Sequence, residues 1–141
     1  LSNLSDGSHS AQVLARDGAG NQRVEPEPAR PFRIDGTPPV IEISGISDGQ
    51  LSATPVTPVI TVSDAHPGTQ HIHLNGQLYA SGTQVSADGD YLLRVEAIDG
   101  AGNRAERELR FTIDRTPPQI TISAPSDNSS TASTSIPVVA Q

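Results

Sequence analysis

The sequence carries an internal repeat, and this repeat limits the folds open to the chain more than any other feature. DGAGN stands at residues 17–21 and again at 99–103, and FRIDGTPP at 32–39 returns as FTIDRTPP at 111–118. Both pairs of segments lie about 80 residues apart, which is a spacing typical of small domains repeated along one chain. We therefore predict tandem repeats of about 80 residues.

The repeat divides the chain into three parts. Residues 37–116 are predicted to form one complete repeat, preceded in residues 1–36 by the C-terminal part of a first repeat. Residues 117–141 are predicted to be the N-terminal part of a third repeat, because PPQITIS at 117–123 matches PPVIEIS at 38–44. We expect the two outer parts to be frayed or to pair with each other between molecules, because their strand edges lack partners.

Short alternating strands separated by turns predict an all-β fold. Apolar residues alternate with polar ones in VIEIS at 40–44 and PVITVSD at 58–64, and QHIHLNGQLY at 70–79 is typical of a hairpin around its Asn-Gly pair. RAERELR at 104–110 contains good helix formers, but its counterpart in the first copy contains three prolines, so we predict that both segments are extended. About seven short strands per repeat favour a two-sheet antiparallel β-sandwich.

The strand at residues 91–98 is predicted to supply much of the core. Tyr91 begins this strand just after a glycine-containing corner, as the tyrosine corner of immunoglobulin-like sandwiches does, and its hydroxyl is expected to bond to nearby backbone. The first copy has His9 at this position, so we expect that the corner is not constant along the array. The residues predicted to face inward are Tyr91, Leu93, Val95 and Ala97.

Charge and composition argue against several classes of function. The formal net charge is -7 and the nine basic residues are scattered, so nucleic-acid binding is not expected. No apolar run approaches the roughly 20 residues that cross a bilayer, so no membrane insertion is expected in this segment. Serine, histidine and aspartate are present but stand in no catalytic motif, so we expect no enzymatic activity and no cofactor other than a metal ion.

One long stretch carries a family resemblance. LNGQLYASGTQVSADGDYLLRVEAIDGAGN at 74–103, followed by FTIDRTPP at 111–118, resembles the bacterial immunoglobulin-like repeats of large surface and secreted proteins, and more loosely the hyalin-type repeats. The resemblance implies an immunoglobulin-like antiparallel β-sandwich, an extracellular or cell-surface location, and a role as a structural spacer or stalk segment of an adhesin-like protein. Its partners would be neighbouring repeats of the same chain. The alternative is a module that binds carbohydrate or a host protein through its loops, including an accessory domain of a secreted enzyme.

Four residues form the candidate metal site. In an immunoglobulin-like topology Asp64 is expected near Asp99 and Asn103, with Asp35 arriving from the linker. Their carboxylate and amide oxygens suit Ca2+, which takes six to eight oxygen ligands in irregular geometry, and related adhesin arrays are similar in using calcium to stiffen their junctions. The alternative is that each aspartate caps the backbone of its own turn.

The sequence offers two further candidate sites, one for a transition metal and one for carbohydrate. His71 and His73 lie two positions apart, hence on one face of a strand, and together with His66 they offer ligands for Zn2+ or Cu2+. Spacing fixes no further ligand, and solvated surface histidines are the alternative interpretation. Carbohydrate binding would rest on Tyr79 and on loops, because the chain has no Trp and Tyr91 is expected to be buried.

Overall fold

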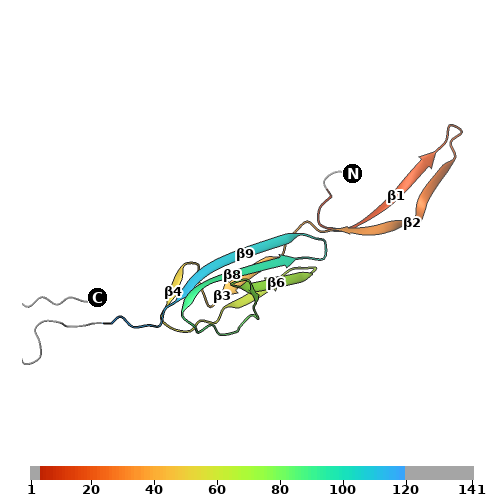
Figure 1. Ribbon diagram of the computed structural model, residues 1–141. Helices are drawn as coiled ribbons and strands as arrows, with labels where there is room; N and C mark the ends of the chain where they lie inside the picture. Colours follow the sequence, from red (N-terminus) through yellow and green to blue (C-terminus); the bar gives the residue numbers. More distant parts are fainter. Residues whose placement is uncertain (1–3, 120–141) are drawn as a thin grey trace, which may run out of the picture.

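The computed structural model describes residues 4–119, whose strands form a hairpin followed by a β-sandwich (Figure 1). Within this range there are nine strands and no helix, which confirms the predicted all-β fold. The predicted third repeat lies outside the described residues from residue 120 onward. The hairpin consists of β1 (Gly7–Arg16) and β2 (Gln22–Ile34), and the sandwich of β3 (Val40–Ser44), β4 (Gln50–Ser52), β5 (Val59–Ser63), β6 (Thr69–Leu74), β7 (Gln77–Leu78), β8 (Gly89–Ile98) and β9 (Arg104–Ile113).

The β1–β2 hairpin extends away from the sandwich (Figure 1). Its antiparallel register begins with Gly7 opposite Ile34 and is interrupted by a bulge between Ala11 and Val13. Two of the three prolines of β2 fall in the segment 26–29, which has no partner across this bulge, so their missing N–H groups cost no ladder hydrogen bond. The expectation of a frayed N-terminal part is therefore wrong for these two strands.

The sandwich consists of a five-stranded and a two-stranded sheet. The strand order is β4-β9-β8-β6-β7 in the larger sheet and β3-β5 in the smaller one. Neighbouring strands are antiparallel, except that the short β4 runs parallel to β9. The architecture is the predicted immunoglobulin-like antiparallel β-sandwich, with one parallel pair that the alternation pattern did not indicate.

The core lies between the two sheets, and the hairpin contributes no residue to it. Leu93 and Val95 of β8 are fully buried, with 0% of their surface exposed, and Ala97 is 1% exposed, as the alternation of this strand predicted. β9 is extended as predicted, so core packing overrides the helix propensity of residues 104–110. The buried hydrophobic residues are Ile41, Ile46, Val56, Ile60, Val85, Leu93, Val95, Ala97, Leu109, Phe111 and Ile113.

The predicted tyrosine corner is present. The Tyr91 hydroxyl donates a hydrogen bond to the Ala87 carbonyl, at 2.9 Å, and its ring stacks on Phe111 with a centroid distance of 5.0 Å. In the hairpin, the Nε2 of His9 lies 2.8 Å from the Ser5 carbonyl oxygen, again four residues back, and its ring stacks on an equivalent phenylalanine. The expectation that the corner varies between copies is therefore wrong, because imidazole makes the same contact as phenol.

The Asn-Gly pair between β6 and β7 forms the predicted hairpin turn. Asn75 and Gly76 both have positive φ, at 49° and 79°, as a two-residue hairpin loop of this kind requires. The Asn75 side chain also accepts a hydrogen bond from the Leu92 amide, at 2.8 Å, and donates one to the Asp90 carbonyl, at 3.0 Å. The turn is thereby attached to the neighbouring strand β8.

Candidate functional site

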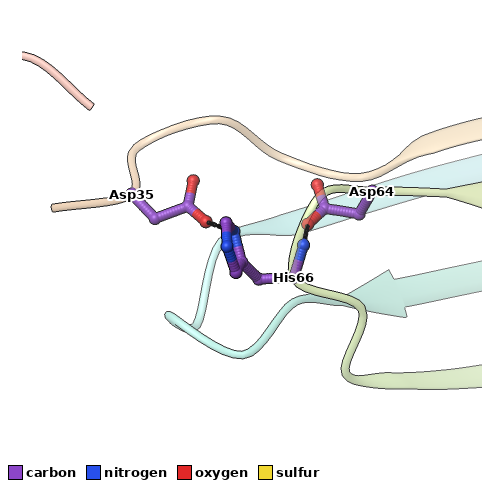
Figure 2. A group of neighbouring side chains, drawn as sticks. All are labelled: Asp35, Asp64 and His66. Carbon is purple, nitrogen blue, oxygen red and sulfur yellow. Dashed lines mark hydrogen bonds and ion pairs between the residues drawn. The ribbon is translucent and has the colours of Figure 1, made fainter. Parts of the chain in front are cut away.

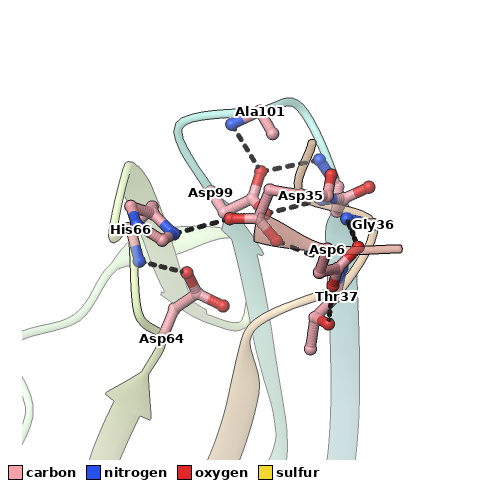
Figure 3. A network of polar contacts seen from close by, with 9 residues as sticks. Asp6, Asp35, Gly36, Thr37, Asp64, His66, Asp99 and Ala101 are labelled. Carbon is pink, nitrogen blue, oxygen red and sulfur yellow. Dashed lines mark hydrogen bonds and ion pairs between the residues drawn. The ribbon is translucent and has the colours of Figure 1, made fainter. Parts of the chain in front are cut away.

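The candidate site lies at the junction between the hairpin and the sandwich. The linker that leaves β2 passes between the base of the hairpin and two loops of the sandwich, which follow β5 and β8 (Figure 3). An open groove lies along this junction and is lined by residues of the hairpin base, the linker and the loop after β5. All four residues of the predicted metal site lie at or beside this junction, but they do not share one ligand cluster.

Asp6, at the base of the hairpin, clamps the linker. Its Oδ1 accepts a hydrogen bond from the Gly36 amide at 2.8 Å, and its Oδ2 accepts one from the Thr37 hydroxyl at 2.5 Å. These hydrogen bonds, first that from Thr37 and then that from Gly36, hold the pKa of Asp6 below its ordinary value. The carboxylate therefore stays ionised at neutral pH and fixes the direction in which the chain leaves the hairpin.

The same clamp recurs at the far end of the sandwich. The Asp88 Oδ1 accepts a hydrogen bond from the Arg115 amide at 3.2 Å, and its Oδ2 accepts one from the Thr116 hydroxyl at 2.9 Å. Each linker also contains an aspartate, Asp35 or Asp114, whose Oδ1 accepts a hydrogen bond from the threonine amide two residues later. The clamp is thus a repeated feature of the chain. It was missed from sequence, although both copies pair an Asp-Gly corner with an Ile-Asp-x-Thr-Pro-Pro linker.

The sandwich holds the first linker from the opposite side. The Asn103 Nδ2 donates a hydrogen bond to the Asp35 carbonyl oxygen at 3.0 Å. The His66 Nδ1 lies 2.6 Å from the Asp35 Oδ2, and the Gly100 amide donates to the His66 carbonyl at 2.8 Å, which joins the two loops. The linker is therefore bound both by the preceding unit, through Asp6, and by the following one.

Asp99 binds the backbone of its own turn. Its Oδ1 accepts hydrogen bonds from the amides of Ala101 and Asn103, at 2.9 and 2.8 Å, and its Oδ2 accepts one from the Asn103 Nδ2 at 2.7 Å. Burial raises the pKa of Asp99, but these hydrogen bonds outweigh it and hold the pKa below its ordinary value. Asp17 makes the same three contacts with Ala19 and Asn21 in the hairpin. The DGAGN segment is therefore a self-capped turn in both copies.

The residues that share one space at the junction are Asp35, Asp64 and His66 (Figure 2). One ligand atom from each lies within 4.8 Å of the others. The Asp64 Oδ1 also accepts a hydrogen bond from the His66 amide at 2.7 Å, so this aspartate caps its own loop. Of the four predicted metal ligands, the structure brings Asp35 and Asp64 together, whereas the Asp99 carboxylate binds its own turn and the Asn103 Nδ2 donates to Asp99 and to the Asp35 carbonyl oxygen.

The structure does not bring the three histidines together as the zinc or copper interpretation requires. His66 belongs to the junction, whereas His71 and His73 lie on β6, opposite Glu96 and Arg94 of β8. Among the described residues, His71 and His73 are part of no group of three metal-ligating side chains. The imidazole that approaches Asp35 and Asp64 is therefore that of His66.

The donor set at the junction determines which ion it suits. Two carboxylates and one imidazole match the ligands that zinc and similar divalent ions take, whereas Ca2+ prefers six to eight oxygens. An oxygen-only site here requires the Asp35 carboxylate to exchange its contact with His66 for a cation. Asp35 and Asp64 are the residues that would hold such an ion, and Asp99 and Asn103 would act by shaping the turn beside them.

Tyr79 does not present an open aromatic platform. Its hydroxyl donates to the carbonyl oxygens of Pro58, at 3.2 Å, and Thr83, and its ring packs against the core. Burial raises the pKa of this phenol. Tyr79, on which carbohydrate stacking would rest, is thus part of the sandwich structure.

Comparison with known families identifies the sequence type. The family model described as "Bacterial Ig-like domain (group 3)" matches residues 1–80, which is more than half of the chain. The chain belongs to this family. The bacterial Ig-like match begins before β1 and ends just after β7, so it covers the hairpin and crosses the clamped linker described above.

A solved structure titled "Structures of Clostridium thermocellum CbhA fibronectin(III)-like modules" is similar at 13% sequence identity and a TM-score of 0.38, over 78% of this chain. The chain spans 64% of the length of that structure. No curated protein matches the sequence. Within residues 4–119 there is no helix of the length and apolar character that would cross a bilayer.

Proposed function

We propose that this chain is a spacer segment of a bacterial surface or secreted protein of the adhesin type, in which clamped linkers set the orientation of consecutive Ig-like units. The observation that carries the proposal is the repeated clamp, because Asp6 and Asp88 bind their linkers through the same pair of carboxylate contacts. A self-contained binding module has no need of two such clamps. The proposal assigns the chain no catalytic activity.

The shape of the chain supports a spacing role. The hairpin lies beyond one end of the sandwich, and the chain leaves the sandwich at the opposite end (Figure 1). Each linker also contains two consecutive prolines, which fix φ and stiffen the connection. Bacterial Ig-like units joined in this way extend a chain without adding a catalytic surface.

Loss of the Asp6 clamp is expected to loosen the junction. Cysteines introduced at the exposed positions Ser10 and Thr61 can carry spin labels without competing thiols, because the chain has no cysteine. Pulsed electron spin resonance should give a narrow distance distribution that broadens in Asp6→Ala. Asp17→Ala is the matched control, because it removes an aspartate that makes three hydrogen bonds in the same hairpin but far from the linker. If the distance distributions of the parent and of Asp6→Ala are equally wide, the clamp does not stiffen the junction and the spacer proposal fails.

We further propose that calcium adds to this stiffness between Asp35 and Asp64. Millimolar Ca2+ added after chelation is expected to raise the melting temperature, since a ligand present at 100 times its Kd stabilises the folded state by about 2.7 kcal/mol. Asp64→Asn should abolish the rise and Asp90→Asn should keep it. His66→Ala should preserve or increase it, because the Asp35 carboxylate is then free of the imidazole. An unchanged melting temperature in the parent removes calcium from the proposal.

A further inference from the structure

The cluster of Asp35, Asp64 and His66 joins two parts of the chain that are distant in sequence. Asp35 belongs to the linker after β2, whereas Asp64 and His66 belong to the loop between β5 and β6 (Figure 2). His66 follows Asp35 by 31 positions, and its imidazole lies against the Asp35 carboxylate. An ion bound by all three side chains therefore connects the linker directly to the sandwich.

The two carboxylates of this cluster lack a partner of permanent positive charge. Among residues 4–119 neither Asp35 nor Asp64 forms an ion pair with an arginine, and the chain contains no lysine. The Asp35 side chain is only 13% exposed, so water screens its charge incompletely. Two like charges that share a partly shielded space repel each other, and a bound cation removes this repulsion.

The turn at 99–103 holds both of the segments that carry these side chains. The Asn103 side chain donates a hydrogen bond to the Asp35 carbonyl oxygen, and the Gly100 amide donates one to the His66 carbonyl oxygen. The backbones on either side of the cluster are therefore fixed before an ion arrives. Such preorganisation lowers the entropic cost of binding.

The donor atoms of the cluster suit a transition ion of the zinc class. The Asp64 Oδ1 accepts the hydrogen bond from the His66 amide, which leaves its Oδ2 for a metal. The His66 Nδ1 and the Asp35 Oδ2 lie 2.6 Å apart, whereas two ligand atoms of a tetrahedral zinc ion lie roughly 3.3 Å apart. A small separation of the two side chains admits an ion in place of the proton that they share, and the neutral imidazole then carries its proton on Nε2.

The imidazole also distinguishes between ions. Ca2+ takes six to eight oxygen ligands, so it gains nothing from a nitrogen donor, whereas imidazole and carboxylate are both ordinary ligands of zinc. Three protein ligands and one water complete a tetrahedral zinc site. The groove beside the cluster is open, so it leaves space for that water.

We propose that Asp35, Asp64 and His66 bind Zn2+ in preference to Ca2+, and that the bound ion ties the linker to the sandwich. This inference rests on the ion-linked junction of the proposed function, but it makes His66 a ligand where an oxygen-only site excludes it. The two ions compete for the same carboxylates.

Isothermal titration calorimetry with ZnCl2 tests the proposal on the full chain, without a polyhistidine tag and after treatment with a chelator. One Zn2+ per chain is expected to bind with a Kd in the micromolar range or below. His66→Ala and Asp64→Asn should each weaken binding by at least about tenfold, since even the loss of a residue that only orients a ligand costs about 10–100-fold. His71→Ala is the matched control, because His71 lies on β6 outside the cluster, and it should leave binding unchanged.

The outcomes separate the zinc site from the proposed function. The zinc site is overturned if no heat of binding is observed, if binding survives in both His66→Ala and Asp64→Asn, if it is lost in His71→Ala, or if millimolar Ca2+ displaces the zinc. Asp64→Asn keeps the shape of its side chain, so it tests the site even where His66→Ala is less stable. His66→Ala should affect the two ions in opposite directions, because it removes a zinc ligand but frees Asp35 for calcium. The spin-label distances of the metal-free chain test the Asp6 clamp alone, so either proposal can fail without the other.

Discussion

Replacement of Phe111 by alanine is expected to destabilise the sandwich by about 3–5 kcal/mol, the usual cost of removing a buried phenylalanine. Phe111 is 2% exposed, belongs to the core between the two sheets, and stacks against Tyr91. A domain of about 80 residues is stable by roughly 4–12 kcal/mol, so the loss removes a large part of the total. The variant should therefore unfold at a much lower urea concentration than the parent.

The repeat provides an internal control for this substitution. Phe32 occupies the same position in the hairpin, where it is 36% exposed and lies outside the sandwich core. Phe32→Ala should shift the unfolding free energy of the sandwich by no more than about 0.5 kcal/mol. Urea titration followed by far-ultraviolet circular dichroism measures both variants, because the chain has no Trp for fluorescence. Equal losses for the two variants would show that the hairpin and the sandwich share one cooperative core.

Gly45→Ala is expected to have the second largest effect, about 2–5 kcal/mol. Gly45 has a φ of +82°, which costs a side-chain-bearing residue about 1–2 kcal/mol. A Cβ atom at this position would also lie 2.2 Å from the backbone carbonyl oxygen of Thr57, so β3 and the segment before β5 would have to separate. Such overpacking adds about 1–3 kcal/mol.

Gly82→Ala separates the two causes of this effect. Gly82 has nearly the same φ, +81°, but a Cβ atom there would meet nothing within 4 Å. Its substitution should cost only the backbone contribution of about 1–2 kcal/mol. Thermal unfolding of both variants compares them under one condition. If the two substitutions cost the same, the contact with Thr57 is relieved by a small backbone shift and has no energetic weight.

The strands were predictable where one face is buried over several residues. In β3, β8 and β9 the alternation of apolar and polar side chains is a local property, so it indicates both the strand and its inward face. In β9 the alternation favoured a strand, whereas the propensity of residues 104–110 favoured a helix. The prolines of the first copy correctly indicated an extended conformation. β4 was not predictable in this way. It has three residues, and its parallel pairing with β9 depends on where the intervening chain returns.

The candidate site was predictable only in part, because some of its contacts follow from the topology and others depend on the local backbone. Topology places Asp35 and Asp64 at the same end of the sandwich, so their proximity follows from the fold. The use of the Asp99 carboxylate depends on the local backbone of its turn, where the self-capped arrangement competes with metal binding for the same oxygens. The Asp6 clamp joins residues about 30 positions apart in the chain, and only the recurrence of the Asp-Gly corner together with the Ile-Asp-x-Thr-Pro-Pro linker in both copies connects its two ends in the sequence.

The placement of the two linkers has a mechanical consequence. One linker enters the sandwich at the start of β3 and the other leaves it at the end of β9, at opposite ends of the unit (Figure 1). Tension along the chain therefore pulls β3 parallel to its own axis, against the ladder that it forms with β5. In this shear geometry the hydrogen bonds of the ladder share the load and must break together. Forced unfolding is governed by the unfolding rate, and this arrangement opposes it along the direction set by the two linkers.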